Sequence, residues 1–244
     1  ASHTNLFGSL SLTQNLINNG VFIGASSSTL YFIGAAMQNV QGNNSISLHN
    51  MQINNSANHV TLQNSITISN LLTLTNGRLI SEIAPIFFSS TALNPVETNA
   101  NRIIGTATME SRVIGTGSLS AFLGVSFDAG ADLGNVSFTR YTGIQGVISN
   151  GSNIGIASYW SFMSDNNASR NLTFNWLSNL DNGKNVSQMQ LWRSTTTTSA
   201  GQWIPANTAV DMSSRSYTYS SNDLQKHWSL SDVSNPLSSL TPEI

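Results

Sequence analysis

The segment Ser45–Leu79, SISLHNMQINNSANHVTLQNSITISNLLTLTNGRL, decides the fold of the first half of the chain. Apolar residues alternate with polar ones in short pairs, and Asn-, Ser- and Gly-rich positions separate the pairs. The pairs are Ile46 and Leu48, Met51 and Ile53, Val60 and Leu62, Ile66 and Ile68, and Leu72 and Leu74. A period of two residues is typical of β-strands with one buried face. The segment therefore predicts several short strands joined by polar corners.

Similar pairs precede this segment at a spacing of about 20 residues, which favours a solenoid whose coils bury their inward side chains on one another. They are Leu10 and Leu12, Val21 and Ile23, and Leu30 and Phe32. Asn and Gly suit the corners because they tolerate a left-handed backbone. We expect corners at Asn18-Asn19-Gly20, Asn43-Asn44, Asn54-Asn55 and Asn76-Gly77, with asparagines hydrogen-bonded along the axis.

The first half of the chain also allows an alternative fold and contains one segment that interrupts the strand pattern. A sandwich of hairpins is the alternative to a solenoid, and it requires tight turns of the kind that Asn76-Gly77 would form. The segment Ile83–Leu93 contains Pro85 and interrupts the alternation, so we expect it to cap or end a sheet edge.

Charge and tryptophan are distributed unevenly, which indicates two domains built on different plans. Among the first 100 residues the only charged ones are Arg78, Glu82 and Glu97, whereas all five tryptophans lie beyond residue 159. We expect a β-solenoid over residues 1–115, a β-sandwich over 116–236 and an exit linker over 237–244. The chain is thus predicted to be all-β, a parallel solenoid followed by an antiparallel sandwich.

The second part predicts short strands separated by turn residues, the pattern of an antiparallel sandwich. The expected strands are Ser120–Phe127, Asn135–Tyr141, Ser158–Met163, Asn171–Leu177, Met189–Trp192, Arg215–Ser220 and His227–Leu230. Asn150-Gly151 and Asp181-Asn182-Gly183 are among the turns between them.

The composition of the chain argues against several classes of partner. The chain has 244 residues, 9 Lys and Arg, 11 Asp and Glu, and a net charge of −2, so no electrostatic case exists for nucleic acid or anionic lipid. It contains no cysteine, which removes disulfides and thiolate metal sites. No apolar run is long enough to span a membrane, so membrane insertion is not expected.

Motifs along the chain resemble the repeats of large surface proteins that the type IX secretion system exports. The motifs include TLYFIGAAMQNVQG (Thr29–Gly42), MQINNSA (Met51–Ala57), LTLTNGRL (Leu72–Leu79), LTFNWLSNLDNGKN (Leu172–Asn185) and HWSLSD (His227–Asp232). The resemblance covers nearly the whole chain and implies an adhesin-like protein that is extracellular or on the cell surface. The C-terminal sorting domain of such proteins is missing from this sequence.

Enzymatic chemistry has little support in the sequence, and we expect no catalytic residues. The histidines His3, His49, His59 and His227 stand in strand or turn contexts without a nucleophile motif. Glycoside hydrolysis needs two facing carboxyl groups, and the first 100 residues offer only Glu82 and Glu97.

Two binding sites remain as alternatives in the second part. Turn oxygens of Asp165, Asn167 and Asp181 are candidate ligands for calcium, the one cofactor that we leave open. Trp203 follows Gly201 and Gln202 outside the apolar strand patterns, so Trp203 with Asp181 is the candidate contact for a glycan.

The expected function is structural or adhesive. The uncharged segment His3–Leu10, with Leu6, Phe7 and Leu10, is the candidate strand for addition to a neighbouring subunit. Head-to-tail contacts of this kind produce filaments when they do not close. The expected partners are therefore further copies of the chain or other surface proteins, and a polysaccharide-binding or polysaccharide-cleaving module is the alternative.

Overall fold

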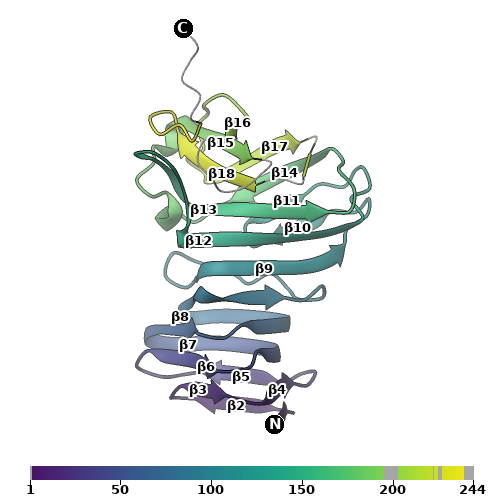
Figure 1. Ribbon diagram of the computed structural model, residues 1–244, viewed down its shortest axis with the longest axis vertical. Helices are drawn as coiled ribbons and strands as arrows, with labels where there is room; N and C mark the ends of the chain where they lie inside the picture. Colours follow the sequence, from purple (N-terminus) through teal and green to yellow (C-terminus); the bar gives the residue numbers. More distant parts are fainter. Residues whose placement is uncertain (1, 195–202, 222, 225–226, 239–244) are drawn as a thin grey trace. The chain divides into compact units, whose positions relative to one another are not determined.

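The computed structural model describes residues 2–194, 203–221, 223–224 and 227–238. It is almost entirely β-structure, with 60% of residues in strands and no α-helix among the described residues. The chain divides into two compact units, Ala1–Arg112 and Val113–Ile244. Figure 1 shows the strands of both units in sequence colours. Within the described ranges, no helix has the length and apolar character needed to cross a membrane.

The first unit is a parallel β-solenoid of about five turns, which confirms the prediction over the sandwich of hairpins. Each of the first two coils has three short strands. They are β1 (His3–Leu6), β2 (Ser9–Leu12) and β3 (Leu16–Asn18), then β4 (Val21–Gly24), β5 (Thr29–Phe32) and β6 (Gln38–Gly42). Strand β1 pairs with β4, β2 with β5 and β3 with β6, all in parallel.

The next coils are formed by longer, continuous strands. They are β7 (Ile46–Leu62), β8 (Ile66–Phe88) and β9 (Ile103–Val113). Strand β7 pairs with β4, β5 and β6 on one side and with β8 on the other. Strand β8 in turn pairs with β9. These pairings are parallel, so residues about one coil apart in the sequence lie side by side.

Inward apolar side chains form columns that run from coil to coil. One column contains Leu10, Leu30, Met51 and Leu72, which are partners in successive strand pairs. Leu30, Met51 and Leu72 are at most 1% exposed. In this column the alternation places every second side chain in a continuous core, as expected for stacked coils. The expected pair Val21 and Ile23 is wrong, because both are exposed and Phe22 between them is the buried residue of β4.

Asparagines link neighbouring coils, which confirms the expected ladders. The Asn76 amide donates to Asn54 Oδ1 at 2.7 Å. Asn70 donates to Asn50 in the same way, also at 2.7 Å. Gly77 adopts a φ of 92° beside Asn76, the left-handed corner that a glycine there permits.

The segment around Pro85 does not end a sheet edge, and that expectation is wrong. Strand β8 continues to Phe88 and pairs with β9 through Ile86, Phe87 and Phe88. The register shifts between Ser81 and Ile86, so a bulge accommodates the proline that cannot donate to the ladder. Phe88 is fully buried and belongs to the core.

The second unit contains the antiparallel sheets that the turn pattern predicted. One set of strands is β12 (Asn135–Asn150), β13 (Asn153–Ser164), β18 (His227–Asp232), β15 (Met189–Ser194) and β16 (Ile204–Pro205), in that spatial order. The other sheet is β10 (Leu119–Phe122), β11 (Val125–Phe127), β14 (Arg170–Asn175) and β17 (Ser216–Ser221). Short 3₁₀ turns η1 (Ser178–Leu180) and η2 (Val186–Gln188) precede β15.

Aromatic side chains fill the space between these two sheets. Phe174 of β14 lies 5.3 Å from Trp160 of β13 and 5.7 Å from Trp228 of β18, measured between ring centroids. Phe127 of β11 lies 5.9 Å from Phe162 of β13. These contacts make the unit a sandwich, because side chains of both inner faces form one core.

The expected exit linker does not begin at residue 237, because Leu237 belongs to the core. It is fully buried and packs in a cluster with Ile148, Tyr159, Trp192 and Trp203. The core of the second unit thus includes the first residue that we assigned to the linker. Residues 239–244 lie outside the described part of the chain.

Candidate functional site

The first coil has an open strand edge. Among the described strands, β1, β2 and β3 each pair on one side only, with β4, β5 and β6. The carbonyls of Gly8 and Leu12 accept from Thr29 N at 3.0 Å and from Ile33 N at 2.9 Å. Because backbone groups alternate between the two sides of a strand, those of Ser9 and Ser11 face the open side.

The side chains of this coil are less covered than those of the next one. Leu6, Leu10, Leu12 and Leu16 are all half-buried. Their partners one coil further on include Leu30, Phe32 and Val40, which are 0% exposed. Terminal coils of solenoids need a polar cover or a neighbour to shield such residues. Among the described residues, the outer edge of this coil therefore presents both unpaired backbone groups and partly exposed apolar side chains.

The segment proposed for strand addition forms this edge. Leu6 lies in β1 and Leu10 in β2, where they pair with Gly24 and Leu30 of the second coil. Phe7 lies between the two strands and is 79% exposed. Since one side of His3–Leu10 is already paired within the chain, the segment can offer only its outer side to a partner.

A second unprotected edge lies in the other unit. Strand β17, with the sequence SYTYSS, ends the four-stranded sheet and pairs among the described strands only with β14. It contains neither a charged residue nor a proline, the features by which proteins commonly shield an edge from unwanted pairing. Within the described ranges, both units therefore carry a strand edge that no other strand of the chain occupies.

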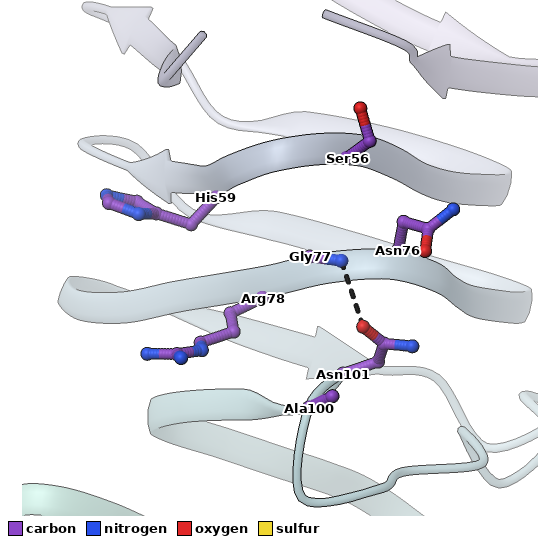
Figure 2. A pocket seen from close by; sticks show the side chains of 7 residues that line it. All are labelled: Ser56, His59, Asn76, Gly77, Arg78, Ala100 and Asn101. Atoms are coloured by element: carbon purple, nitrogen blue, oxygen red, sulfur yellow. Dashed lines mark hydrogen bonds between the residues drawn. The ribbon is translucent and has the colours of Figure 1, made fainter. Parts of the chain in front are cut away.

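A polar hollow of about 400 Å³ lies on the side of the solenoid, within the size range of small-ligand sites. Figure 2 shows His59 of β7 and Arg78 of β8 extending in the same direction from neighbouring strands. The lining consists of Ser56, His59, Asn76, Gly77, Arg78, Ala100 and Asn101. It contains no carboxylate and no aromatic ring besides the imidazole.

Asn101 fixes the shape of the hollow. Its Oδ1 accepts from Gly77 N at 3.0 Å, the bond drawn in Figure 2. Its amide nitrogen donates to the Thr75 carbonyl at 2.9 Å. Since both ends of the side-chain amide are held by the backbone of β8, the loop before β9 is tied to the rim of the hollow.

No protein-family model matches the chain. Likewise, no curated protein and no solved structure shows significant similarity to it. Functional inference therefore depends on the geometry of these edges and of the hollow.

Trp203 does not form the expected glycan contact. It is 1% exposed and packs in the cluster with Trp192 and Leu237, so its ring offers no face to a ligand. Asp181 accepts from Arg215 Nη2 at 2.6 Å and from Trp176 Nε1 at 2.9 Å. Its carboxylate thus holds the turn after η1 in place, and that ion pair helps keep the pKa of Arg215 above its ordinary value, chiefly through the hydrogen bond.

The three candidate calcium ligands have separate hydrogen-bond partners. Asp165 accepts from the backbone and side-chain nitrogens of Asn135 at 2.9 and 2.7 Å, which lowers the pKa of Asp165. Asn167 Oδ1 accepts from Leu224 N at 3.2 Å, and Asp181 is bound by Arg215. Among the described residues, no group of three or more acidic or histidine side chains has the arrangement to hold a metal ion.

Sequence reasoning missed the hollow beside His59 and Arg78. The charge count had already isolated Arg78 as the single Lys or Arg among the first 100 residues. The sequence does not show the register of β7 against β8, and only that register places His59 opposite Arg78.

Proposed function

We propose that this chain is a non-enzymatic structural and adhesive protein of the cell surface that assembles head to tail by strand addition. The observation that carries the proposal is the open edge of the first coil, defined by β1, β2 and β3. Completing this edge would satisfy the outward backbone groups of Ser9 and Ser11 and cover the half-buried leucines. Both gains favour association, since unpaired backbone groups and exposed apolar surface are costly. Extracellular location and export by the type IX system belong to the same proposal.

The proposed occupant of this edge is β17 of a second copy. Strand β17 is uncharged and unprotected, and its extended backbone supplies the alternating donors and acceptors that a β-edge requires. A contact between two different surfaces of the same chain is heterologous, so it repeats from copy to copy. Such a contact would yield filaments unless the rotation between copies closes a ring.

The test substitutes proline at the outer side of β2. In Ser11→Pro the lost N–H faces the open side, so the pairing of β2 with β5 is retained while the added strand loses a donor. We expect the wild-type chain to sediment as higher oligomers with rising concentration and to form filaments in electron micrographs. Ser11→Pro is expected to remain monomeric.

The control is Ser11→Thr, which keeps the backbone donor and a side chain suited to strands. It should assemble as the wild type does. Circular dichroism and thermal unfolding of the diluted proteins establish that both variants retain the solenoid. A wild-type chain that stays monomeric at millimolar concentration, or equal assembly of the proline and threonine variants, would refute assembly through this edge.

A polysaccharide-binding module is the second candidate function. One observation favours it, namely the hollow that contains His59 and Arg78. The burial of Trp203 argues against a sugar that stacks on an exposed tryptophan there, so recognition would depend on hydrogen bonds and charge.

A further inference from the structure

The hollow lies along a ladder of basic side chains. His59 of β7 and Arg78 of β8 are partners in the parallel register. One residue beyond Arg78, Leu79 pairs with Ile103, and Leu79 N donates to the Arg102 carbonyl at 3.0 Å. His59, Arg78 and Arg102 therefore occupy one register position on three successive coils.

This arrangement has an electrostatic cost. Neighbouring strands are about 4.8 Å apart, and like charges placed directly opposite each other on adjacent strands are destabilising. The pKa of Arg102 is lowered, first by burial and then by the charge of Arg78, while Glu97 acts in the opposite direction. Glu97 thus balances part of the positive charge on the Arg102 side of the ladder.

Arg78 has no such compensation. Its side chain is exposed, and within the described ranges its guanidinium has neither an ion-pair partner nor a hydrogen-bond partner. An exposed arginine is ordinary on most protein surfaces, but this unit has almost no charged residues. Here the free guanidinium lines the hollow beside the imidazole of His59, which extends to the same side of the strands.

We propose that this hollow binds the oxyanion of an acidic saccharide, either a uronate carboxylate or a sulfate ester. The planar guanidinium of Arg78 matches the geometry of such a group and can donate two parallel hydrogen bonds to it. His59 adds a second nitrogen from the neighbouring strand. Ser56 and Asn76 also line the hollow, and their polar groups suit the hydroxyls of a saccharide that extends along the strands from the anion.

The residues that line the hollow favour an oxyanion carried by a saccharide over one carried by a nucleic acid. A nucleic-acid backbone needs a long basic surface, whereas this chain has a net charge of −2 and the ladder has three members. The lining is dominated by hydroxyl, amide and imidazole groups, which suit a hydroxyl-rich ligand. The site lies on the side of coils three to five, so its occupation does not depend on assembly at the first coil.

The experiment measures binding of defined oligosaccharides to the purified full chain by calorimetry at low ionic strength. The probes are an oligogalacturonate, a sulfated oligosaccharide, a neutral dextran oligomer, and inorganic sulfate alone. We expect one or both acidic oligosaccharides to bind, with affinity falling as salt is added. The neutral oligomer should not bind, and inorganic sulfate should bind more weakly than the acidic sugar.

Two variants locate the site. Arg78→Gln should lower the affinity about tenfold or more, because a charge-assisted bidentate contact is lost. Arg78→Lys keeps the charge but loses the planar fork, so we expect an intermediate affinity. Lys184→Gln is the matched control, since it removes one positive charge from the other unit, and it should bind as the wild type does.

Three results would overturn the proposal. They are equal binding by wild type and Arg78→Gln, equal binding of the neutral oligomer, or inorganic sulfate binding as tightly as the acidic sugar. The last result would mean that a free oxyanion, without its saccharide, is the ligand. Because Arg78 is exposed, its replacement should leave the circular dichroism spectrum unchanged, and that spectrum verifies folding of each variant.

Discussion

Leu10 of β2 stacks directly on Leu30 of β5, yet the two side chains have different environments. Leu30 is 0% exposed, because β2 covers one side of it and β7 the other. Leu10 is half-buried, since the described strands cover only one of its sides. The same residue type at the same place in successive coils thus distinguishes a coil covered on both sides from one covered on one side by the described strands.

The different burial of Leu10 and Leu30 predicts that replacing each by alanine lowers the free energy of unfolding by a different amount. Leu30→Ala should lower the free energy of unfolding by about 2–5 kcal/mol, the usual cost of a buried leucine. Leu10→Ala should cost about 1 kcal/mol in the monomer, because less of its surface is removed from water on folding. Urea unfolding at low protein concentration measures both values. Equal losses would show that the first coil is already covered in the monomer.

Arg170 is expected to be the most sensitive side chain of the second unit. It is 3% exposed, and it donates to the carbonyls of Ala131, Gly117 and Gly115 at 2.8, 2.7 and 2.7 Å, and also to that of Asp128. Arg170→Met leaves these oxygens without their donors. Since each buried polar group without a partner costs about 1–3 kcal/mol, we expect a loss of at least about 3 kcal/mol.

Arg170→Lys separates charge from geometry in the same network. Lysine keeps the positive charge but has three donors on one atom, which cannot reach carbonyls on several loop segments at once. Its unfolding midpoint should fall between those of the wild type and Arg170→Met. A methionine variant as stable as the wild type would contradict a structural role for this network.

His227 predicts a pH dependence of stability below neutrality. Burial lowers the pKa of His227 below its ordinary value of 6.5. As the pH falls through 6.5, the unfolded chain binds a proton that the folded chain does not yet bind, so stability decreases. The loss continues until the pH reaches the lowered pKa of the folded state. Above about pH 7 this residue contributes no slope.

Thermal unfolding between pH 5 and 8 tests this expectation, because carboxylates contribute little in that window. His227→Gln should flatten the slope of the unfolding midpoint against pH. His3→Gln replaces an exposed histidine and controls for the substitution itself. A slope unchanged in His227→Gln would assign the pH dependence to other groups.

The stacked core could be predicted from the sequence because its signal is local. Pairs such as Ile46 and Leu48 alternate at period two and recur after one coil as Ile66 and Ile68, so one pattern encodes both strand and stacking. The Asn54 and Asn76 ladder followed from the same reasoning. Pro85 was misread because a bulge allows β8 to continue past it, and bulges have no local signature as clear as alternation.

The candidate sites were harder to predict because they depend on contacts distant in the sequence. Trp203 follows polar residues, and only its packing against Trp192 and Leu237 reveals that it is buried. Asp181 resembled a free turn carboxylate, but Arg215, 34 residues away, binds it. The hollow required the pairing of His59 with Arg78, a register that depends on the corners between them.

The most direct test of the central claim is amide hydrogen exchange at Ser9 and Ser11. Their N–H groups face the open side of β2, whereas those of β5 lie between two strands. We predict fast exchange at both serines in dilute protein and slow exchange at concentrations where the wild type assembles. Strand β5 should be protected under both conditions. Assembly that leaves Ser9 and Ser11 exchanging as fast as in the monomer would contradict strand addition at this edge.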